Sequence, residues 1–335
     1  MRYTTRIVAV SAGFLLAAGA LVACGSSGSS GTAPIAKASG KGCAPVAGNQ
    51  LVVLTDNKNL QLSDVIVPAV NVKANQPPLM NALNKVSSVL TTPKLVAMNK
   101  DVDINRQTPA AAAAAFAQQN GLTSGIGTGG SGKIIIGAAD FSENQELAEL
   151  YKIVLKEAGY DATTQTIGSR ELYEPQLEQN KIQVVPEYAA TLTTFLNGKQ
   201  NGASAASPAS SDVNTTMAAL TKLGQKANIV FGQPSTATDE NAFAVTTATA
   251  QKYGLKTLSD FAAKCSGSAS SLAGPAECPQ RPFCQLGLQK TYGITFGKFV
   301  NMGQDTGGPV TKKALIAGDA TMGLVFSSDS TLTQQ

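Results

Sequence analysis

Apolar stretches alternate with short polar breaks in a β-α-β-α-β order through the middle of the chain. Ile134–Ile136 predicts a buried strand, and an apolar stripe with helical spacing follows over 143–158. A strand over 161–167 and a helix over 170–180 lead to the β-branched pair Val184-Val185. This order predicts a parallel sheet whose ligand-binding loops lie beyond the carboxyl ends of its strands.

One segment follows the last strand of that predicted core. Pro186 stops the strand, and Tyr188 and Thr191 come directly after it. Residues in such positions line the crevice where open α/β sheets bind ligands. The sequence therefore predicts that Tyr188 is an aromatic wall of a small-molecule site and that Thr191 is a polar contact in it. The alternative is that Tyr188 only packs under the next helix.

The same pattern predicts elements on both sides of the core. In chain order, a strand is expected at 51–54, an extended piece at 65–72, helices at 79–90, 94–99, 108–116 and 213–227, strands at 229–231 and 242–246, helices at 258–264, 286–292 and 309–317, and a strand at 324–326.

Two glycine-rich segments, 121–132 and 199–214, predict loops. Gly125, Gly127 and Gly130 match the dinucleotide-binding spacing G-x-G-x-x-G. That motif follows a strand and opens a helix, whereas this one precedes a strand. We therefore interpret 121–132 as a linker.

The amino end has the layout of a processing signal. Arg2 and Arg6 precede an apolar stretch, Ile7–Ala20, that is too short for a comfortable membrane span. Leu21-Val22-Ala23-Cys24 resembles a bacterial lipobox, which predicts a signal peptide over 1–23 and lipidation of Cys24. An ordinary secretory signal is the alternative. The Ser/Gly-rich run predicts a lipidated tether over 24–43 and a protein held at the extracytoplasmic face of the cell membrane.

Composition removes several classes of function. The 335 residues include no histidine, which excludes Ser-His-Asp and Cys-His catalysis and histidine-containing metal sites. The net charge of +4 comes without long basic runs, so we expect no nucleic-acid partner. We predict no cofactor, no metal and no enzymatic activity, with an envelope enzyme that uses carboxylates such as Glu143 or Glu187 as the remaining alternative.

Four cysteines beyond Cys24 predict disulfides. Cys43, Cys265, Cys278 and Cys284 form an even set in an oxidising compartment, and they allow three pairings. A short staple between Cys278 and Cys284 is favoured, and Cys43 with Cys265 then follows. A zinc site is the minor alternative.

Several motifs carry a family resemblance. In the core they are Ile136-Gly137-Ala138-Ala139-Asp140-Phe141-Ser142-Glu143, Leu147-Ala148-Glu149-Leu150-Tyr151 and Pro186-Glu187-Tyr188. Later in the chain they are Ala276-Glu277-Cys278-Pro279-Gln280-Arg281, Gly287-Leu288, Tyr292-Gly293 and Thr311-Lys312-Lys313-Ala314-Leu315. Together they resemble the glycine betaine/choline (osmoprotectant) substrate-binding proteins of ABC importers.

The resemblance implies a bilobed α/β fold of the periplasmic-binding-protein type, here circularly permuted. Segment 44–122 is similar to the family's carboxyl-terminal part of lobe one, although it stands at the amino end. The implied order is a joint over 123–132, lobe one over 133–237, lobe two over 238–326 and a tail over 327–335 that returns to lobe one. Hinges are expected near Thr238 and Phe326. A separate small domain over 44–122 is the alternative.

The resemblance also implies a set of ligand contacts. Tyr188 and Phe243 would form an aromatic cage, Thr191 would bind the ligand tail, and Arg281 would bind a carboxylate with two hydrogen bonds. The remaining candidates are Asn144, Phe326, Asp140 and Asn241. Ala139 stands where the family often has lysine, and a further tyrosine is missing near Val310 or Thr311, so we expect a sparse cage.

The function implied is the capture of a quaternary ammonium osmolyte, such as glycine betaine, choline or carnitine, and its delivery to a membrane ABC permease. The alternative within the same fold is a different small polar or aromatic solute.

Overall fold

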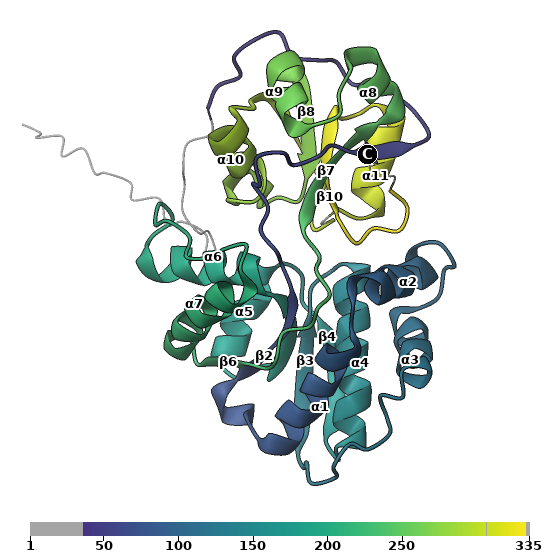
Figure 1. The fold of residues 1–335 in the computed structure, drawn as a ribbon, viewed down its shortest axis with the longest axis vertical. Helices are drawn as coiled ribbons and strands as arrows, with labels where there is room; N and C mark the ends of the chain where they lie inside the picture. Colours follow the sequence, from purple (N-terminus) through teal and green to yellow (C-terminus); the bar gives the residue numbers. More distant parts are fainter. Residues whose placement is uncertain (1–35, 306, 333–335) are drawn as a thin grey trace, which may run out of the picture.

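The computed structural model describes residues 36–305 and 307–332, so the predicted signal peptide and Cys24 lie outside the described residues. Two five-stranded sheets, each covered by helices, form two lobes that are stacked along the long axis of the molecule (Figure 1). This arrangement agrees with the predicted bilobed α/β fold. Within the described ranges, no helix has the length and apolar character needed to cross a membrane.

Lobe one contains the predicted β-α-β-α-β core. Its strands, in the order in which they lie in the sheet, are β4 (Asp161–Thr166), β3 (Lys133–Ala138), β5 (Val184–Tyr188), β2 (Ile66–Asn71) and β6 (Ile229–Phe231). Its helices are α1 (Pro77–Val89), α2 (Thr92–Asp103), α3 (Pro109–Gln119), α4 (Ser142–Glu157), α5 (Arg170–Glu178), α6 (Ala189–Asn201) and α7 (Val213–Lys226).

The three strands of the predicted core are parallel, as expected, but β2 and β6 make the sheet of lobe one mixed. β3 runs parallel to β4 and β5, but β2 runs antiparallel to both β5 and β6. Ile66 at the start of β2 pairs with Tyr188 at the end of β5. The start of β2 therefore lies beside the end of β5. As a result, β2 runs in the opposite direction to β5.

Alternating side chains divide the interior of lobe one into two layers. Val184 and Ile66 pack with α1 to α4 on one face of the sheet, whereas Val185 and Val67 pack with α5, α6 and α7 on the other. This is the two-residue period of a strand that is buried on both sides. It explains why these strands are apolar at consecutive positions.

Lobe two is built around a second sheet. Its strands, in sheet order, are β1 (Leu51–Val53), β7 (Asn241–Thr246), β10 (Met322–Phe326), β8 (Gly267–Gly274) and β9 (Phe296–Asn301). Its helices are α8 (Thr247–Tyr253), α9 (Leu258–Cys265), the short turn α10 (Gln285–Gly287) with a wider turn over Leu288–Tyr292, and α11 (Pro309–Ala317).

The position of β1 corrects the expected boundary of lobe one. Segment 44–122 was predicted to belong wholly to lobe one, but β1 pairs antiparallel with β7 in lobe two. Val52 packs into one core layer of lobe two, and Leu51 and Val53 pack into the other. The amino-terminal segment thus completes lobe two first, and the chain reaches lobe one only near Asp64.

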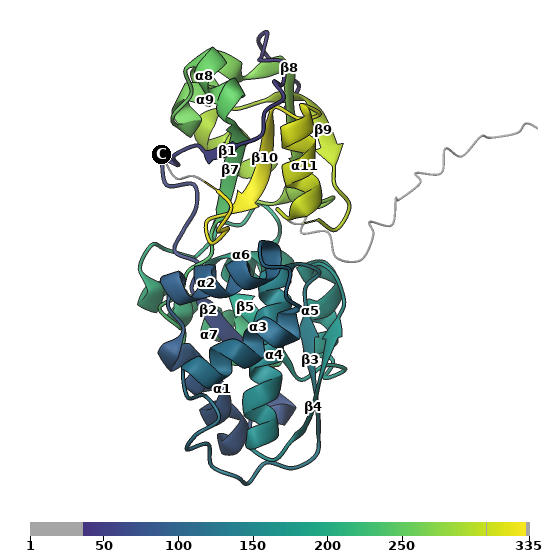
Figure 2. The ribbon, with the colours of Figure 1, turned by 90° about the vertical axis from the view of Figure 1, so that its right-hand side faces the viewer.

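Among the described residues, three segments cross between the lobes, and Figure 2 shows the narrow connection between them. The first crossing, near Asp64, runs beside the second, where Asp239 N donates to Asp64 O at 3.1 Å. The third follows Phe326, where Ser327 N donates to Glu240 O at 2.8 Å. Thr238 and Phe326 therefore lie at crossings, as predicted, whereas the crossing at Asp64 was not predicted.

Both favoured disulfides are confirmed. Cys43 is joined to Cys265 and Cys278 to Cys284. The first bond holds the amino-terminal segment against α9, and Lys41 also forms a bridge with Gly267 at the start of β8. The end of the predicted tether, from residue 36 to 43, therefore runs along lobe two.

The glycine-rich segment 121–132 contains no helix or strand, in keeping with its interpretation as a linker. It connects α3 to β3, and the backbone N–H groups of Gly129 and Gly130 both donate to Ala158 O. Gly130 lies against the Tyr160 ring so closely that a Cβ atom would collide with it. Gly130 of the G-x-G-x-x-G spacing therefore allows the linker to pack closely against Tyr160, and no helix begins at this motif.

Candidate functional site

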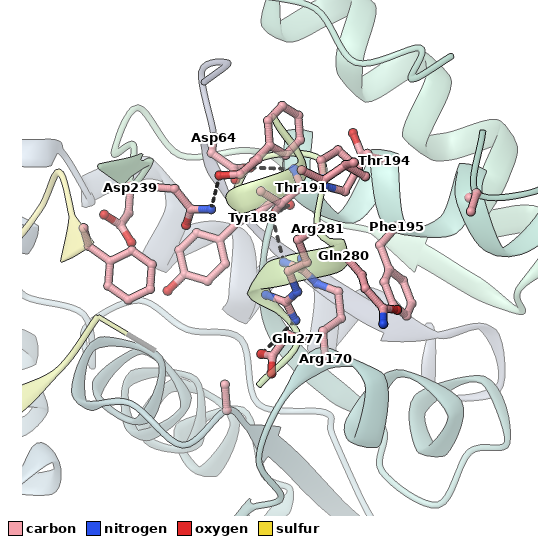
Figure 3. Close-up of a pocket in the computed structure, with 18 of the residues that line it drawn as sticks. Asp64, Arg170, Tyr188, Thr191, Thr194, Phe195, Asp239, Glu277, Gln280 and Arg281 are labelled. Atoms are coloured by element: carbon pink, nitrogen blue, oxygen red, sulfur yellow. Dashed lines mark hydrogen bonds and ion pairs between the residues drawn. The ribbon is translucent and has the colours of Figure 1, made fainter. Parts of the chain in front are cut away.

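A cavity lies between the two lobes, at the crossings, and its lining comes from both (Figure 3). The contributing parts are the end of β5, the first turns of α5 and α6, the start of β7, the end of β10 and the loop that holds the Cys278–Cys284 disulfide. The lining comprises Asp64, Ala139, Phe141, Arg170, Tyr173, Tyr188, Thr191, Thr194, Phe195, Gly198, Ala203, Ala205, Asp239, Asn241, Glu277, Gln280, Arg281, Pro282, Phe283, Leu286 and Phe326.

The cavity has a volume of about 100 Å³. A single water needs about 10–15 Å³, so the space would hold several water-sized groups. The site therefore fits a small solute and not a peptide.

Six aromatic side chains line the cavity: Phe141, Tyr173, Tyr188, Phe195, Phe283 and Phe326. Three of them form a continuous wall. The ring centroid of Phe141 lies 6.1 Å from that of Tyr188 and 5.1 Å from that of Phe326. Because Phe326 belongs to lobe two and the other two rings to lobe one, this wall spans the interface between the lobes.

Four of these rings were not predicted. Two carried a usable signal, since Phe195 follows Thr191 by one helical turn and Phe141 lies inside a family motif. Phe283 is held by the short disulfide loop, whose path the sequence does not specify. Tyr173 reaches the cavity from α5 only because that helix begins at the interface.

Tyr188 is fixed by a hydrogen bond at its far end. Its hydroxyl donates to Glu143 Oε1 at 2.8 Å, and the side chain is 6% exposed. Glu143 Oε2 also accepts from Asn99 Nδ2 at 2.7 Å and from Ser328 Oγ at 2.6 Å. These bonds satisfy the hydroxyl inside the protein, so the ring is what Tyr188 offers to the cavity.

Two buried aspartates stand at the crossings. Asp64 Oδ1 accepts hydrogen bonds from the backbone N–H groups of Ala190 at 2.7 Å and Thr191 at 3.2 Å, at the start of α6. Burial raises the pKa of Asp64 to about 7, although the charge of Arg170 opposes the rise. Burial also raises the pKa of Asp239, and the nearby carboxyl of Glu143 adds to the shift.

Both arginines of the lining are already paired with glutamates. Arg170 Nη2 lies 2.7 Å from Glu187 Oε2 and also donates to Thr191 Oγ1 at 2.9 Å. Arg281 Nη2 donates to Glu171 Oε1 at 3.0 Å and to Oε2 at 2.8 Å. Because Arg281 belongs to lobe two and Glu171 to α5 of lobe one, this ion pair connects the lobes across the cavity mouth.

The structure brings five of the predicted ligand contacts together. Tyr188, Thr191, Arg281, Asn241 and Phe326 all line the cavity. Their contact with a ligand stays a prediction.

Three other predicted contacts lie elsewhere, and these placements are corrections. Phe243 is 1% exposed in the core of lobe two, because it lies two residues further along β7 than Asn241, on the same face of the strand but beyond the cavity. Asn144 is fully buried, and it accepts from Ala139 N and donates to Pro186 O, which ties α4 to the end of β5. Asp140 is exposed and lines a separate groove on the other side of Phe326.

The two glutamates considered for catalysis are not in the lining either. Glu143 lies behind Tyr188, and Glu187 is 1% exposed and receives Arg170 and the Tyr173 hydroxyl. Neither carboxylate faces the space that a substrate would occupy.

A comparison with protein families decides the affiliation of the chain. The model of the substrate-binding domain of ABC-type glycine betaine transport systems matches residues 44–119 and 132–335. The chain belongs to this family. A search of the curated proteins finds no match.

Membership in this substrate-binding family accounts for the two lobes and the cavity between them. The family is a transport component and not a family of enzymes. The unmatched residues between the two matched segments coincide with the glycine-rich linker. Circular permutation of the family order stays a prediction.

Proposed function

We propose that this substrate-binding protein captures a quaternary ammonium osmolyte, such as glycine betaine, choline or carnitine, and delivers it to a membrane ABC permease. The observation that carries the proposal is the interlobe cavity with six aromatic side chains and two buried aspartates.

The chemistry of the ligand requires such a lining. A methyl-covered ammonium group has no N–H to donate, so hydrogen bonds cannot hold it. Aromatic faces attract it instead, with about 0.5–2 kcal/mol for each ring, depending on how far the site is desolvated. The wall formed by Phe141, Tyr188 and Phe326 supplies adjacent faces, and Asp64, whose pKa is about 7, supplies negative charge above that pH.

Delivery to a permease needs a ligand that is enclosed and then released. The three crossings lie beside the cavity, and the lining is shared between the lobes. A change in the angle between the lobes therefore opens or closes the site around its contents.

The lipobox-like segment supports attachment to the membrane through lipid on Cys24. We expect the Cys24→Ala variant to leave the membrane fraction and to retain ligand binding. Recovery of this variant in the membrane fraction at the wild-type level would contradict the anchor.

Isothermal titration calorimetry tests the ligand class. We expect saturable binding of at least one of glycine betaine, choline, carnitine and proline betaine to the purified chain. Absence of binding heat with all four, for protein with a cooperative thermal transition, would reject the proposed ligand class but not the family.

A different small solute is the second candidate, and the aromatic lining gives it some support because such walls also accommodate neutral or aromatic molecules. Thermal-shift screening separates the two candidates. A neutral or aromatic compound that raises the melting temperature more than every quaternary ammonium compound would favour the second candidate.

A further inference from the structure

We propose that this cavity selects a cation that has no carboxylate, such as choline, over a zwitterion such as glycine betaine. The inference rests on the proposed function, and it concerns the part of the ligand beyond the ammonium group. It follows from how the charged side chains of the lining are paired.

Both cationic side chains of the lining are committed to protein carboxylates. Nε and Nη2 of Arg170 both donate to Glu187, and Arg170 is 8% exposed. Nε and Nη2 of Arg281 both donate to Glu171, and Nη2 also lies 3.3 Å from Glu277 Oε1. These contacts use Nε and Nη2 but not Nη1, so a ligand carboxylate could approach only the Nη1 side of each guanidinium, whose charge a glutamate already neutralises.

The carboxylates that face the cavity outnumber the arginines. Asp64, Asp239 and Glu277 line it, while the arginine partners Glu187 and Glu171 lie outside the lining and neutralise the two guanidinium groups. Figure 3 shows the two arginines grouped with Glu277, away from Asp239. The lining therefore has no net positive charge to attract a ligand carboxylate, while its carboxyl groups can accept a hydrogen bond from a ligand hydroxyl.

The neutral side-chain donors near the cavity are also engaged. Asn241 Nδ2 donates to Phe283 O at 3.1 Å, and Thr191 Oγ1 accepts from Arg170 and lies 3.4 Å from Tyr188 O. By contrast, a ligand hydroxyl can donate to a carboxylate such as Asp64 or Asp239. An alcohol tail thus finds acceptors in a site where most of these side-chain donors already have protein partners.

Calorimetric titration of the full chain with choline and with glycine betaine at one pH and ionic strength tests this selectivity. A ligand carboxylate would lose its hydration without gaining an unneutralised cationic partner, so we expect the Kd for choline to be lower by roughly tenfold or more. Glycine betaine binding as tightly as choline, or more tightly, would overturn the selectivity and leave the proposed function intact. Failure of both compounds and of the other quaternary ammonium ligands would overturn both.

A variant tests the cause. Glu171→Gln removes the negative charge that neutralises Arg281. We therefore expect the Kd for glycine betaine, divided by the Kd for choline, to fall severalfold, mainly because glycine betaine binds more tightly. Glu178→Gln is the matched control, because Glu178 is on the same helix, pairs with Lys199 and lies outside the lining. A ratio that is unchanged in Glu171→Gln would overturn the role assigned to the arginine pairing.

Discussion

Tyr188 joins the two properties on which the proposed site depends. Its ring stands beside Phe141 in the aromatic wall, and its hydroxyl holds the buried carboxyl of Glu143. The ring is therefore a ligand contact in the proposal, whereas the hydroxyl positions the ring. Two substitutions separate these roles.

For Tyr188→Ala we expect the affinity for a quaternary ammonium ligand to fall by roughly tenfold or more, since one ring contributes up to about 2 kcal/mol in a desolvated site. For Tyr188→Phe we expect a much smaller loss, because the ring stays. Calorimetry measures both, and circular dichroism checks that each variant is folded. Equal losses in the two variants would show that the hydroxyl and not the ring is what matters.

Glu146 in α4 gives a prediction about stability. It is fully buried, neither carboxyl oxygen has a hydrogen-bond partner, and burial raises its pKa to about 9. The folded state therefore keeps a proton that the unfolded state releases above its ordinary pKa of 4.5. Stability from this group is present at low pH and is lost as the pH rises toward 9.

Glu146→Gln removes that titration. We expect the free energy of unfolding of the variant, relative to wild type, to increase by more than about 1.4 kcal/mol between pH 5 and pH 9, since each unit of pKa shift corresponds to about 1.4 kcal/mol. Denaturant titrations at the two pH values measure the difference. A pH-independent difference would contradict a neutral Glu146 in the folded protein.

At the residue scale, the sequence was informative where a pattern fixed the direction of a side chain. Tyr188 and Thr191 follow a strand that ends at the interface, and both line the cavity. Phe243 and Asn144 occupy family-like positions but lie in the interior. Phe243 is two residues deeper along β7 than Asn241, and two hydrogen bonds to backbone groups hold the side chain of Asn144. Those factors depend on register and on partners that lie far away in the sequence.

Among the structural elements, the loop closed by Cys278 and Cys284 places the most cavity residues in the shortest length of chain. Glu277, Gln280, Arg281, Pro282 and Phe283 all line the cavity. The disulfide restricts this segment, which has only a short stretch of 3-10 helix, Cys278–Gln280, as regular structure. The bond therefore orders one wall of the site.

We expect the double variant Cys278→Ala, Cys284→Ala to lose about 2 kcal/mol of stability, the loop-entropy value for a ring this short. Ligand affinity should also fall, because the wall is no longer ordered before binding. Denaturant unfolding and calorimetry measure the two effects. An affinity equal to that of wild type would show that the loop adopts its path without the bond.

Element prediction succeeded for the long amphipathic helices and for most apolar strands, but it missed β8 and β9. The predicted helices over 143–158 and 213–227 agree closely with α4 and α7. β8 has the sequence GSASSLAG, which carries no apolar alternation, yet it is the parallel partner of β10 and β9. Its small residues allow close approach, since a Cβ at Gly267 would collide with the backbone at Gly40.

For the whole molecule, the path of the chain between the lobes was the least predictable feature. The sequence indicated crossings near Thr238 and Phe326, but not the one at Asp64. β1 could not be assigned to a lobe from its own pattern, because an apolar strand fits either sheet. Its partner, β7, lies almost two hundred residues later in the chain.

That first crossing brings a titratable group to the cavity, which predicts a pH dependence. Burial raises the pKa of Asp64 to about 7, although the positive charge of Arg170 opposes the rise. Asp239, with Glu143 beside it, faces the same region and raises the cost of ionising the cluster. The carboxyl of Asp64 is neutral below pH 7 and negative above it, while a quaternary ammonium ligand keeps its charge throughout.

Affinity for choline should therefore rise severalfold between pH 6 and pH 8. In Asp64→Asn the rise should be smaller, and the fold should persist because asparagine also accepts hydrogen bonds at a helix start. Calorimetry at several pH values, with the ionic strength held constant, measures this. An affinity that falls over this range would contradict the electrostatic role of Asp64.

A crystal structure of the chain with choline tests the central claim most directly, because it shows where a quaternary ammonium group binds. We predict that the trimethylammonium nitrogen lies within about 6 Å of the ring centroid of Tyr188 and of at least one neighbouring ring, between the two lobes. Choline bound outside this cavity, with the six aromatic side chains free of ligand, would contradict the account.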